Sequence, residues 1–147
     1  MTIVNRFTYR LLVNRKQHTL TVCKLGPLGY KVIATYPIAV GTIGHETPQG
    51  KYKVISKVQN PSWYMPNTEW VPKDQRGKVI PGGAPENPIK AAFLQLTHDP
   101  TGNIGIHGTA ALDSLGSDAS HGCIRVAPEV ALHLFRTIPK NTQVRII

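Results

Sequence analysis

The first sixty residues alternate apolar with polar positions, a pattern typical of β-strands that bury one face. The clearest run has an apolar residue at every second position: Phe7, Tyr9, Leu11 and Val13. Further runs start at Leu20, span Tyr30 to Val40, and lie around Tyr52 to Val58, with short turns between them. These lengths and spacings predict an antiparallel meander.

The second half of the chain predicts shorter elements. Two short strands are expected over 92–97 and 103–107, and a closing strand over 143–147. The one good helix begins at Pro128, a residue suited to the first helical position, and runs to about Ile138, where Pro139 stops it. The predicted fold class is therefore mainly β with one late helix.

Between these halves, residues 61–88 lack apolar periodicity. Six of the twelve prolines fall there, together with Trp63, Tyr64 and Trp70. A stretch of this kind is either a disordered insertion or an ordered lid over a functional site. The aromatic residues favour the lid, because disordered segments are poor in them. We place this Pro/Gly-rich lid at about 59–91.

Length and composition narrow the class of protein. A chain of 147 residues predicts one domain, 1–147, and 41% apolar with 17% charged residues excludes disordered and coiled-coil proteins. No apolar run approaches the roughly 20 residues that a membrane helix needs. The N-terminal residues show no signal-peptide core.

The chain is basic, with 17 Lys and Arg against 8 Asp and Glu, a formal charge of +9. That charge suits nucleic acid, an anionic surface or an anionic polymer. The positive residues are scattered from Arg6 to Arg145, and the densest group, Lys51, Lys53 and Lys57, shares one face of a strand. We interpret this group as a solvated face.

The chemically distinctive segment is 104–126. Cys123 is bracketed by His107 and His121, Arg125 follows it, and four glycines lie in the segment: Gly105, Gly108, Gly116 and Gly122. A thiol with an ordinary pKa of roughly 8.5 is mostly protonated at neutral pH, so a nucleophilic cysteine needs a neighbouring base or positive charge. The imidazoles and the guanidinium supply both. A glycine turn before the thiol can also aim backbone N–H groups at an oxyanion.

Two other interpretations stay open on the residues alone. His107, His121 and Cys123 are of the residue types that bind zinc, but the recognised ligand spacings are absent. A buried structural thiol is the other alternative. It suits Cys23, in a predicted strand, better than Cys123, whose histidine neighbours are poor core material.

The same residues resemble a specific family signature. His-Gly-Thr at 107–109, with twelve residues between the histidine and Ser-His-Gly-Cys-Ile-Arg at 120–125, is similar to the signature of the YkuD-type L,D-transpeptidases. Thr-Pro-Gln-Gly-Lys-Tyr at 47–52 resembles the family's Thr-Pro turn. Asn-Pro-Ser-Trp at 60–63 and Asn-Pro at 87–88 resemble its lid segments. The resemblance covers most of the chain, from about Tyr9 to Ile147.

The resemblance implies a β-sandwich with an active-site cleft beneath the lid, and an enzyme that cross-links peptidoglycan in cell wall biogenesis and cell shape. In the family, a cysteine thioester carries the acyl group of a tetrapeptide stem, after loss of its terminal D-amino acid, to an amine of another stem. By position, Cys123 is then the nucleophile, His107 is the base, and the carbonyl of Gly108 orients the imidazole. The amides of Gly122 and Cys123 are expected to form the oxyanion hole.

Three further motif residues are candidate substrate contacts: Ser120, His121 and Arg125. Arg125 can pair with a stem carboxylate or with an acidic residue of the chain, namely Asp113, Asp118 or Glu129. Ser120 can contact substrate or brace its own turn. Nothing in the residues or the resemblance demands a metal or an organic cofactor.

Rival functions remain open. With water as acceptor, the same site makes an L,D-carboxypeptidase, and without catalysis the basic chain is a binding module for a wall polymer or nucleic acid. The expected partners are peptidoglycan stem peptides and not nucleic acid. The expected location is the cell wall or another extracytoplasmic compartment, although the chain shows no export signal or transmembrane segment. The residues predict no oligomeric state.

Overall fold

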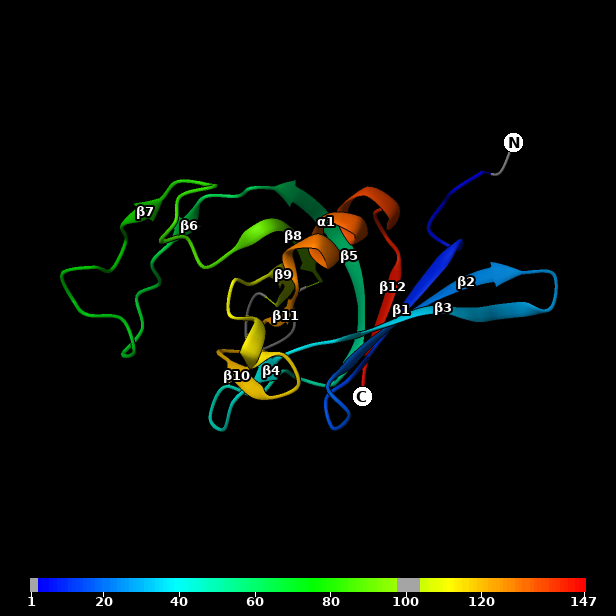
Figure 1. Ribbon diagram of the computed structural model, residues 1–147, viewed down its shortest axis with the longest axis horizontal. Coiled ribbons are helices and arrows are strands. Elements are labelled where there is room, and N and C mark those ends of the chain that lie inside the picture. The colour runs from blue at the N-terminus through cyan, green and yellow to red at the C-terminus, as the bar shows by residue number, and fades with distance from the viewer. Residues whose placement is uncertain (1–2, 98–103) are drawn as a thin grey trace.

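A computed structural model describes residues 3–97 and 104–147. Its main feature is an eight-stranded sheet in the order β11-β9-β8-β5-β12-β1-β2-β3 (Figure 1). The strands of this sheet are β1 (Tyr9–Asn14), β2 (Thr19–Gly26), β3 (Gly29–Pro37), β5 (Gly50–Gln59), β8 (Lys90–Leu96), β9 (Gly105–Gly108), β11 (Ile124–Val126) and β12 (Gln143–Ile146). Two short pairs accompany it, namely β4 (Val40–Gly41) with β10 (Asp118–Ser120) and β6 (Trp63–Tyr64) with β7 (Val79–Ile80).

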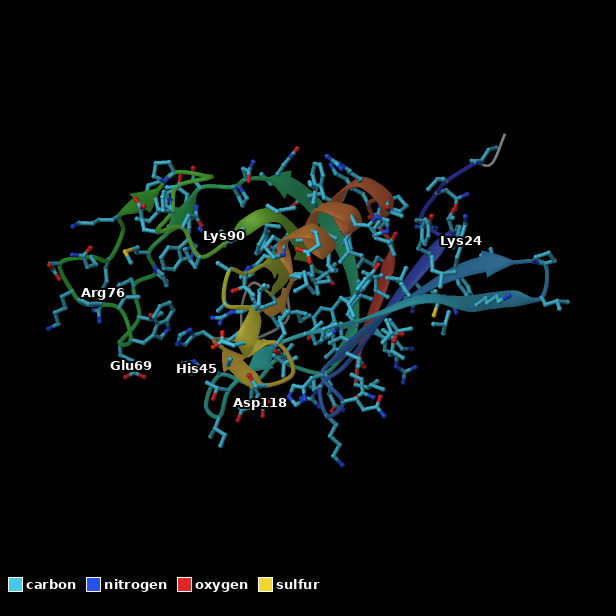
Figure 2. The ribbon with its side chains drawn as sticks, in the orientation of Figure 1. Lys24, His45, Glu69, Arg76, Lys90 and Asp118 are labelled. Atoms are coloured by element: carbon cyan, nitrogen blue, oxygen red, sulfur yellow. The ribbon has the colours of Figure 1, made fainter. Side chains whose placement is uncertain are left out.

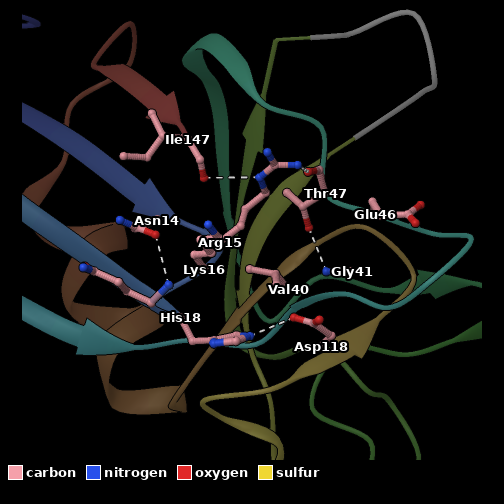
Figure 3. A pocket seen from close by; sticks show the side chains of 11 residues that line it. Asn14, Arg15, Lys16, His18, Val40, Gly41, Glu46, Thr47, Asp118 and Ile147 are labelled. Atoms are coloured by element: carbon pink, nitrogen blue, oxygen red, sulfur yellow. Dashed lines mark hydrogen bonds and ion pairs between the residues drawn. The ribbon is translucent and has the colours of Figure 1, made fainter.

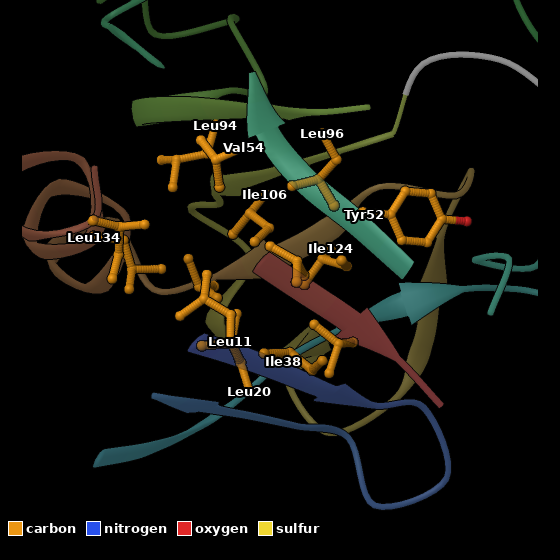
Figure 4. Packing of buried hydrophobic residues seen from close by; sticks show 14 of the residues in the cluster. Leu11, Leu20, Ile38, Tyr52, Val54, Leu94, Leu96, Ile106, Ile124 and Leu134 are labelled. Atoms are coloured by element: carbon orange, nitrogen blue, oxygen red, sulfur yellow. The ribbon is translucent and has the colours of Figure 1, made fainter. Parts of the chain in front are cut away.

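Strand β5 divides the large sheet into two halves. Its residues 50–53 pair with β12, whereas residues 54–59 pair with β8, and the register shifts between Val54 and Ser56. A bulge of this kind bends a strand and increases its twist. Buried side chains from the two halves meet in one core, among them Leu11, Leu94 and Ile106 (Figure 4). The predicted mainly β sandwich is confirmed.

The closing strand lies in the middle of the sheet and not at an edge. Strand β12 runs parallel to β1 and antiparallel to β5, so it joins the two halves of the chain. Val144 and Ile146 face the core, while Gln143 and Arg145 are exposed on the other face. The first three strands form the predicted antiparallel meander.

The helix α1 (Pro128–Thr137) begins at the predicted proline and ends where Ile138 leaves the helical conformation. It buries Ala131 and Leu134 and packs on β8 and β9. This position brings Pro128 against Gly108, at the end of β9. Among the described residues, no helix has both the length and the apolar character needed to span a membrane.

Lys57 does not belong to the solvated face predicted with Lys51 and Lys53. Its amine donates to the carbonyls of Phe135 and Ile138, at 3.0 and 2.7 Å, where the helix end leaves acceptors without partners. The bulge after Val54 moves Lys57 to the face of β5 opposite Lys51 and Lys53. The alternation of residues along the sequence does not predict this bulge.

The strand predictions differ from the structure at two places. The run expected from Tyr30 to Val40 is interrupted at Pro37, because proline has no N–H to donate to a ladder, and the chain then moves to β4 in another sheet. Strands β10 and β11, three residues each, flank the Cys123 turn and are not predicted. Asn103, the first residue of a predicted strand, lies outside the described residues.

The segment between β5 and β8, residues 60–89, projects from the sheets as an arm (Figure 1). At its base, the Asn87 amide nitrogen is within hydrogen-bond distance of the carbonyls of Pro61, Ile80 and Pro81, at 3.0, 3.3 and 3.0 Å. Asn87 is 1% exposed, so these hydrogen bonds are buried, and they join the two ends of the arm. The arm occupies the range in which the sequence predicts a lid.

Candidate active site

Strands β9 and β11 are parallel neighbours, so their side chains share faces in a fixed register. His107 is paired with Arg125, and Ile106 with Ile124. Because both isoleucines are fully buried in the core, His107, Arg125 and the preceding Cys123 face the opposite side. Three of the residues that the sequence singles out are thereby brought together.

The imidazole of His107 is buried and oriented. Its Nδ1 lies 2.8 Å from the carbonyl oxygen of Gly108. A carbonyl only accepts, so Nδ1 carries the proton and Nε2 is left as the acceptor. Burial is the main cause that lowers the pKa of His107 to about 4; the Gly108 carbonyl opposes the shift, and the charge of Arg125 adds to it. The imidazole is therefore neutral at pH 7 and can act as a base.

An aromatic ring and two glycines fix the surroundings of this imidazole. The Phe93 ring stacks against His107, with 6.1 Å between ring centroids and 19° between planes. A Cβ at Gly105 would collide with the Phe93 ring, and a Cβ at Gly108 would collide with the carbonyl of Lys90. Neither glycine position therefore admits a side chain.

Cys123 is partly exposed as a residue, but its thiol is directed into the protein. Burial raises its pKa, an effect that a hydrogen bond from the Gly105 N–H and the charge of Arg125 oppose. With the thiol protonated and His107 neutral, the resting site holds no thiolate–imidazolium pair. A base must therefore take the thiol proton as the sulfur attacks.

The turn before the thiol is held by hydrogen bonds within itself. Gly122 has a φ of +127°, a conformation that residues with a side chain rarely adopt. The Ser120 hydroxyl donates to the Cys123 carbonyl at 2.6 Å and accepts from the Gly122 N–H at 3.1 Å. Ser120 is 1% exposed, so its hydroxyl is used entirely within the turn.

The geometry of this turn bears on two predictions. Of the two roles open to Ser120, it favours bracing the turn over contact with substrate, because the hydroxyl is buried and already bonded twice. The Gly122 N–H already has an acceptor, so of the two amides expected to form the oxyanion hole only that of Cys123 remains a candidate.

A threonine from the Thr-Pro turn supports the turn before Cys123 through hydrogen bonds. Thr47 is 1% exposed, and its hydroxyl donates to the Gly122 carbonyl at 2.7 Å. The same hydroxyl accepts from the Gly41 N–H at 2.8 Å (Figure 3). Arg15 in turn donates to the Thr47 carbonyl at 3.0 Å. The motif at 47–52 signals that this turn matters, but the sequence assigns no role to Thr47.

Strand β10, which carries Ser120, is anchored at its other end by an ion pair. Nε2 of His18 lies 2.7 Å from a carboxylate oxygen of Asp118 (Figure 3). Both residues line a cavity of about 660 Å³ that also reaches Thr47. Neither Cys123 nor His107 lines this cavity.

His121 is exposed, and an aromatic residue of the arm covers one face of its ring. Trp70 stacks on it with 4.0 Å between centroids and 9° between planes, and His45 meets it edge-on at 4.9 Å. Figure 2 shows Glu69 and His45 where the arm approaches the loop after β4. Burial and the charges of His45 and Arg125 lower the pKa of His121. The sequence gives no sign of the Trp70 contact.

The Arg125 guanidinium has no carboxylate partner in the described part of the chain. Asp118, one of the three acidic residues considered for it, is paired with His18 instead. The positive charge of Arg125 lowers the pKa of both motif histidines and of the thiol. The guanidinium of Arg125, close to Cys123, is therefore available to bind an anion.

This arrangement is typical of enzymes that transfer an acyl group through a cysteine: a thiol, a neutral imidazole oriented by a backbone carbonyl, and a braced glycine turn. Within 3–97 and 104–147, no three His, Cys, Asp or Glu side chains are placed to hold a metal ion. A family model, YkuD, described as the L,D-transpeptidase catalytic domain, matches residues 8–146. The chain belongs to this family.

Relatives in bacteria agree with the family. The Bacillus subtilis protein YqjB, classed as an L,D-transpeptidase, is 36% identical over 138 residues, which cover 92% of this chain and 69% of YqjB. B. subtilis YkuD is 32% identical over 138 residues, covering 94% of this chain and 65% of YkuD. Escherichia coli ErfK/SrfK is 32% identical over 126 residues, covering 82% of this chain and 39% of the relative. The chain thus spans only part of the length of each.

Solved structures agree on the fold. L,D-transpeptidase 3 from Mycobacterium tuberculosis, in complex with a faropenem-derived adduct, superposes with a TM-score of 0.70 at 22% identity, covering 95% of this chain and 60% of that one. An L,D-transpeptidase from Mycobacterium smegmatis gives 0.68 at 21% identity, covering 95% and 58%. The predicted family, type of enzyme and fold are confirmed at this level.

Proposed function

We propose that the protein is a peptidoglycan L,D-transpeptidase in which Cys123 is the nucleophile and His107 the base. The observation that carries the proposal is the shared face of β9 and β11, on which the His107 imidazole is paired with Arg125, with Cys123 directly before β11. Membership of the family supports the substrate class, the stem peptides of peptidoglycan.

The first half-reaction forms a thioester. Nε2 of His107 accepts the proton of the Cys123 thiol as the sulfur attacks the carbonyl carbon that precedes the terminal D-residue of a tetrapeptide stem. The carbon–nitrogen bond then breaks, and the imidazolium gives its proton to the departing amine. A pKa of about 4 favours this cycle, because the imidazole is neutral at the start and its protonated form is a good acid.

The second half-reaction forms the cross-link. An amine of another stem attacks the thioester carbon, and His107 accepts the proton that this amine loses. The carbon–sulfur bond breaks, and the imidazolium returns a proton to the sulfur of Cys123. The products are a new amide between two stems and the resting enzyme.

Two groups around the thiol have supporting roles. The Cys123 N–H is the candidate donor to the oxyanion of each tetrahedral intermediate. Arg125, which lacks a carboxylate partner among the described residues, is placed to bind a carboxylate of the stem with two parallel hydrogen bonds. A stem carboxylate would give the Arg125 guanidinium the partner that the described residues do not provide.

The arm is the lid of this site. Its Trp70 ring lies on His121, two positions before the nucleophile, so the arm covers the approach to the turn. Aromatic surface at this place reduces the access of water to the thioester, which favours transfer to an amine over hydrolysis. The substrate also places the working protein at the cell wall, outside the cytoplasm.

Mass spectrometry of the intact protein tests the proposal. The protein is incubated with purified tetrapeptide stems that differ in their diamino acid, and the small products are analysed from the same tube. We expect an acyl adduct that lacks the terminal residue of the stem, together with dimeric stems. Tripeptide without dimer would instead mean an L,D-carboxypeptidase.

Two variants and a second probe sharpen this test. Cys123→Ala should give neither adduct nor product, whereas Cys23→Ala, which removes the other thiol, should keep both. A solved relative carries a faropenem-derived adduct, so faropenem serves as an acylating probe that does not depend on the choice of stem. A folded protein that reacts with no stem and not with faropenem would overturn the proposal.

A further inference from the structure

The acidic residues are distributed very unevenly along the chain. None of the eight lies within 1–45, 47–68 or 130–147. Strands β1, β2, β3, β5 and β12 therefore contain no carboxylate, and they carry seven basic residues: Arg10, Lys24, Lys31, Lys51, Lys53, Lys57 and Arg145. The net charge of +9 is thus concentrated on one half of the sandwich.

Strand register gathers four of these residues on one exposed surface. Lys51 lies directly opposite Arg145, and Lys53 lies opposite Gln143, which is itself paired with Arg10. All of these side chains are exposed on the face of β5, β12 and β1 that points away from the core. We call Arg10, Lys51, Lys53 and Arg145 the basic face; its three strands are adjacent in the sheet (Figure 1).

The basic face is unfavourable for the protein by itself. Like charges directly opposite each other in a sheet destabilise it, and Lys51 with Arg145 is such a pair. Within the described residues, no member of the basic face forms an ion pair with a carboxylate. A bound anion would relieve this repulsion.

One end of the basic face is preorganised. The Arg10 guanidinium stacks on the Tyr30 ring at 3.9 Å, and Arg6 lies over Phe7 at 4.6 Å. The Tyr30 hydroxyl donates to the Phe7 carbonyl at 2.5 Å, which fixes the two aromatic residues relative to each other. A stacked guanidinium keeps its N–H edge free for a phosphate and loses less freedom on binding.

These residues border a cavity. Arg6, Arg10, Lys51 and Lys53 line a space of about 540 Å³ at this end of the basic face. Asn141 and Gln143 add neutral hydrogen-bonding groups to its wall. The surface therefore combines a recess with an open row of cations.

We propose that the basic face binds a flexible phosphodiester polymer built from polyol units. Neighbouring strands are about 4.8 Å apart and alternate residues of a strand about 6.6 Å apart, so Lys51 has one cation beside it on the next strand and one along its own strand, while Arg10 lies two strands from Lys53 across Gln143. A single small anion would contact one or two of the four cations, whereas a chain that carries many phosphates can contact all four. The hydroxyl groups of a polyol match the neutral donors and acceptors beside the cations.

The occupancy of the aromatic rings disfavours single-stranded nucleic acid. Proteins that bind such strands stack the bases on open aromatic faces. Here guanidinium groups already lie over the rings of Phe7 and Tyr30. The surface is therefore suited to phosphates and not to bases.

The basic face is separate from the catalytic residues. It lies on β5, β12 and β1, whereas His107 and Cys123 belong to β9 and the turn before β11, at the edge of the sheet. Binding of polymer can therefore be measured without turnover, and the inference does not depend on the chemistry of Cys123.

The test is the affinity of the purified protein for fluorescent poly(glycerol phosphate) at several salt concentrations. The basic-face variant is Lys51→Gln with Lys53→Gln and Arg145→Gln. Its matched control removes the same charge elsewhere, through Lys31→Gln, Arg136→Gln and Lys140→Gln. We expect the basic-face variant to bind at least about 10-fold more weakly and with a flatter salt dependence, by about 0.7–0.9 in the log–log slope per lost contact. The control should stay within about threefold of the unmodified protein.

Three results would overturn the inference. The first is that the unmodified protein does not bind at low salt. The second is equal weakening in both triple variants, which would mean attraction by net charge alone. The third is tighter binding of a single-stranded oligonucleotide through the same residues, which would make the surface a nucleic-acid site.

Thermal unfolding supplies a second readout that does not need the polymer. Lys51→Glu replaces the like-charge pair with an opposite-charge pair across from Arg145. The variant should therefore melt at a higher temperature than the unmodified protein and bind poly(glycerol phosphate) more weakly. A lower melting temperature would contradict the repulsion on which the inference stands.

Discussion

The turn before Cys123 and the arm meet at His121, but they are held in opposite ways. In the turn, the hydroxyls of Ser120 and Thr47 each make two hydrogen bonds to backbone atoms, and both residues are 1% exposed. The arm approaches the same segment through the stacked ring of Trp70, which is 38% exposed.

The two kinds of contact suit two different functions, namely holding Cys123 in place and opening to admit a substrate. Buried hydrogen bonds to fixed backbone atoms hold the nucleophile in one position, as bond formation requires. A partly exposed stacked pair is worth only about 0.5–1.5 kcal/mol, so it can part to admit a substrate and close again. Damage to the turn should therefore lower kcat, and damage to the arm contact should mainly change KM.

The largest expected effect is at the base. His107→Gln keeps a polar side chain but removes the proton acceptor, and kcat for stem cross-linking should fall by about 100- to 10,000-fold. Steady-state kinetics with a purified tetrapeptide measure this. A loss of less than tenfold would mean that another group takes the thiol proton.

The same variant also tests how the free energy of unfolding depends on pH. The pKa of His107 is about 4 in the folded protein against 6.5 in the unfolded chain, so between these values the unfolded state binds more protons. The neutral His107 therefore contributes to the free energy of unfolding above pH 6.5. This contribution, about 3 kcal/mol, is lost as the pH falls toward 4. Denaturant unfolding from pH 7 to 4 should show this loss in the unmodified protein and not in His107→Gln.

A smaller effect is expected at Ser120. Ser120→Ala leaves the Gly122 N–H without its acceptor, so the free energy of unfolding should fall by about 1–3 kcal/mol and kcat by about 10- to 100-fold. KM should change little. If instead KM rises while stability is unchanged, the hydroxyl contacts substrate and does not brace the turn.

Thr47→Val tests the support behind the turn. It keeps the shape of the side chain and removes the two hydrogen bonds, so kcat should fall by about tenfold along with a loss of about 1–3 kcal/mol in stability. Thr142→Val is the matched control, because Thr142 is fully buried and donates to the Pro139 carbonyl at 2.7 Å, away from the site. The control should lose stability and keep kcat; equal losses of kcat in both variants would contradict the role of Thr47.

The smallest effect is expected at the arm. Trp70→Ala should raise KM for the stem by about three- to tenfold, consistent with the loss of one aromatic pair, while kcat stays within about threefold. Trp70→Phe should restore most of the affinity. Tyr64→Ala, an exposed aromatic of the same arm, should leave KM unchanged, and an equal effect there would remove any special role of the Trp70 contact.

Patterns among residues close together in the sequence predicted many of the strands and the helix. Alternation located the first strands, and Pro128 located the start of the helix, because each depends on neighbours within a few residues. The motif around Cys123 indicated the family to which the chain belongs. An aromatic signal was also available at Phe93, which alternates with the core residues Ala92 and Leu94 and must face the other side.

Contacts between distant segments could not be predicted in the same way. The Thr47 hydroxyl bonds a carbonyl 75 residues away, and the Trp70 stack joins the arm to the motif. The central place of β12 depends on pairing between the two ends of the chain. Cys23, expected in the core, is half-buried instead, because it alternates with the buried Leu20 and Val22 and pairs with the exposed Arg10 on the outer face.

The central claim is that a neutral His107 takes the proton of a neutral Cys123, and single-turnover acylation by a tetrapeptide, measured from pH 4 to 8, tests it most directly. We predict a rate that is nearly constant above about pH 5 and falls as the pH approaches 4, where His107 becomes protonated. A rate that climbs tenfold with each pH unit up to pH 8 would contradict the account, because hydroxide and not His107 would then be generating the thiolate.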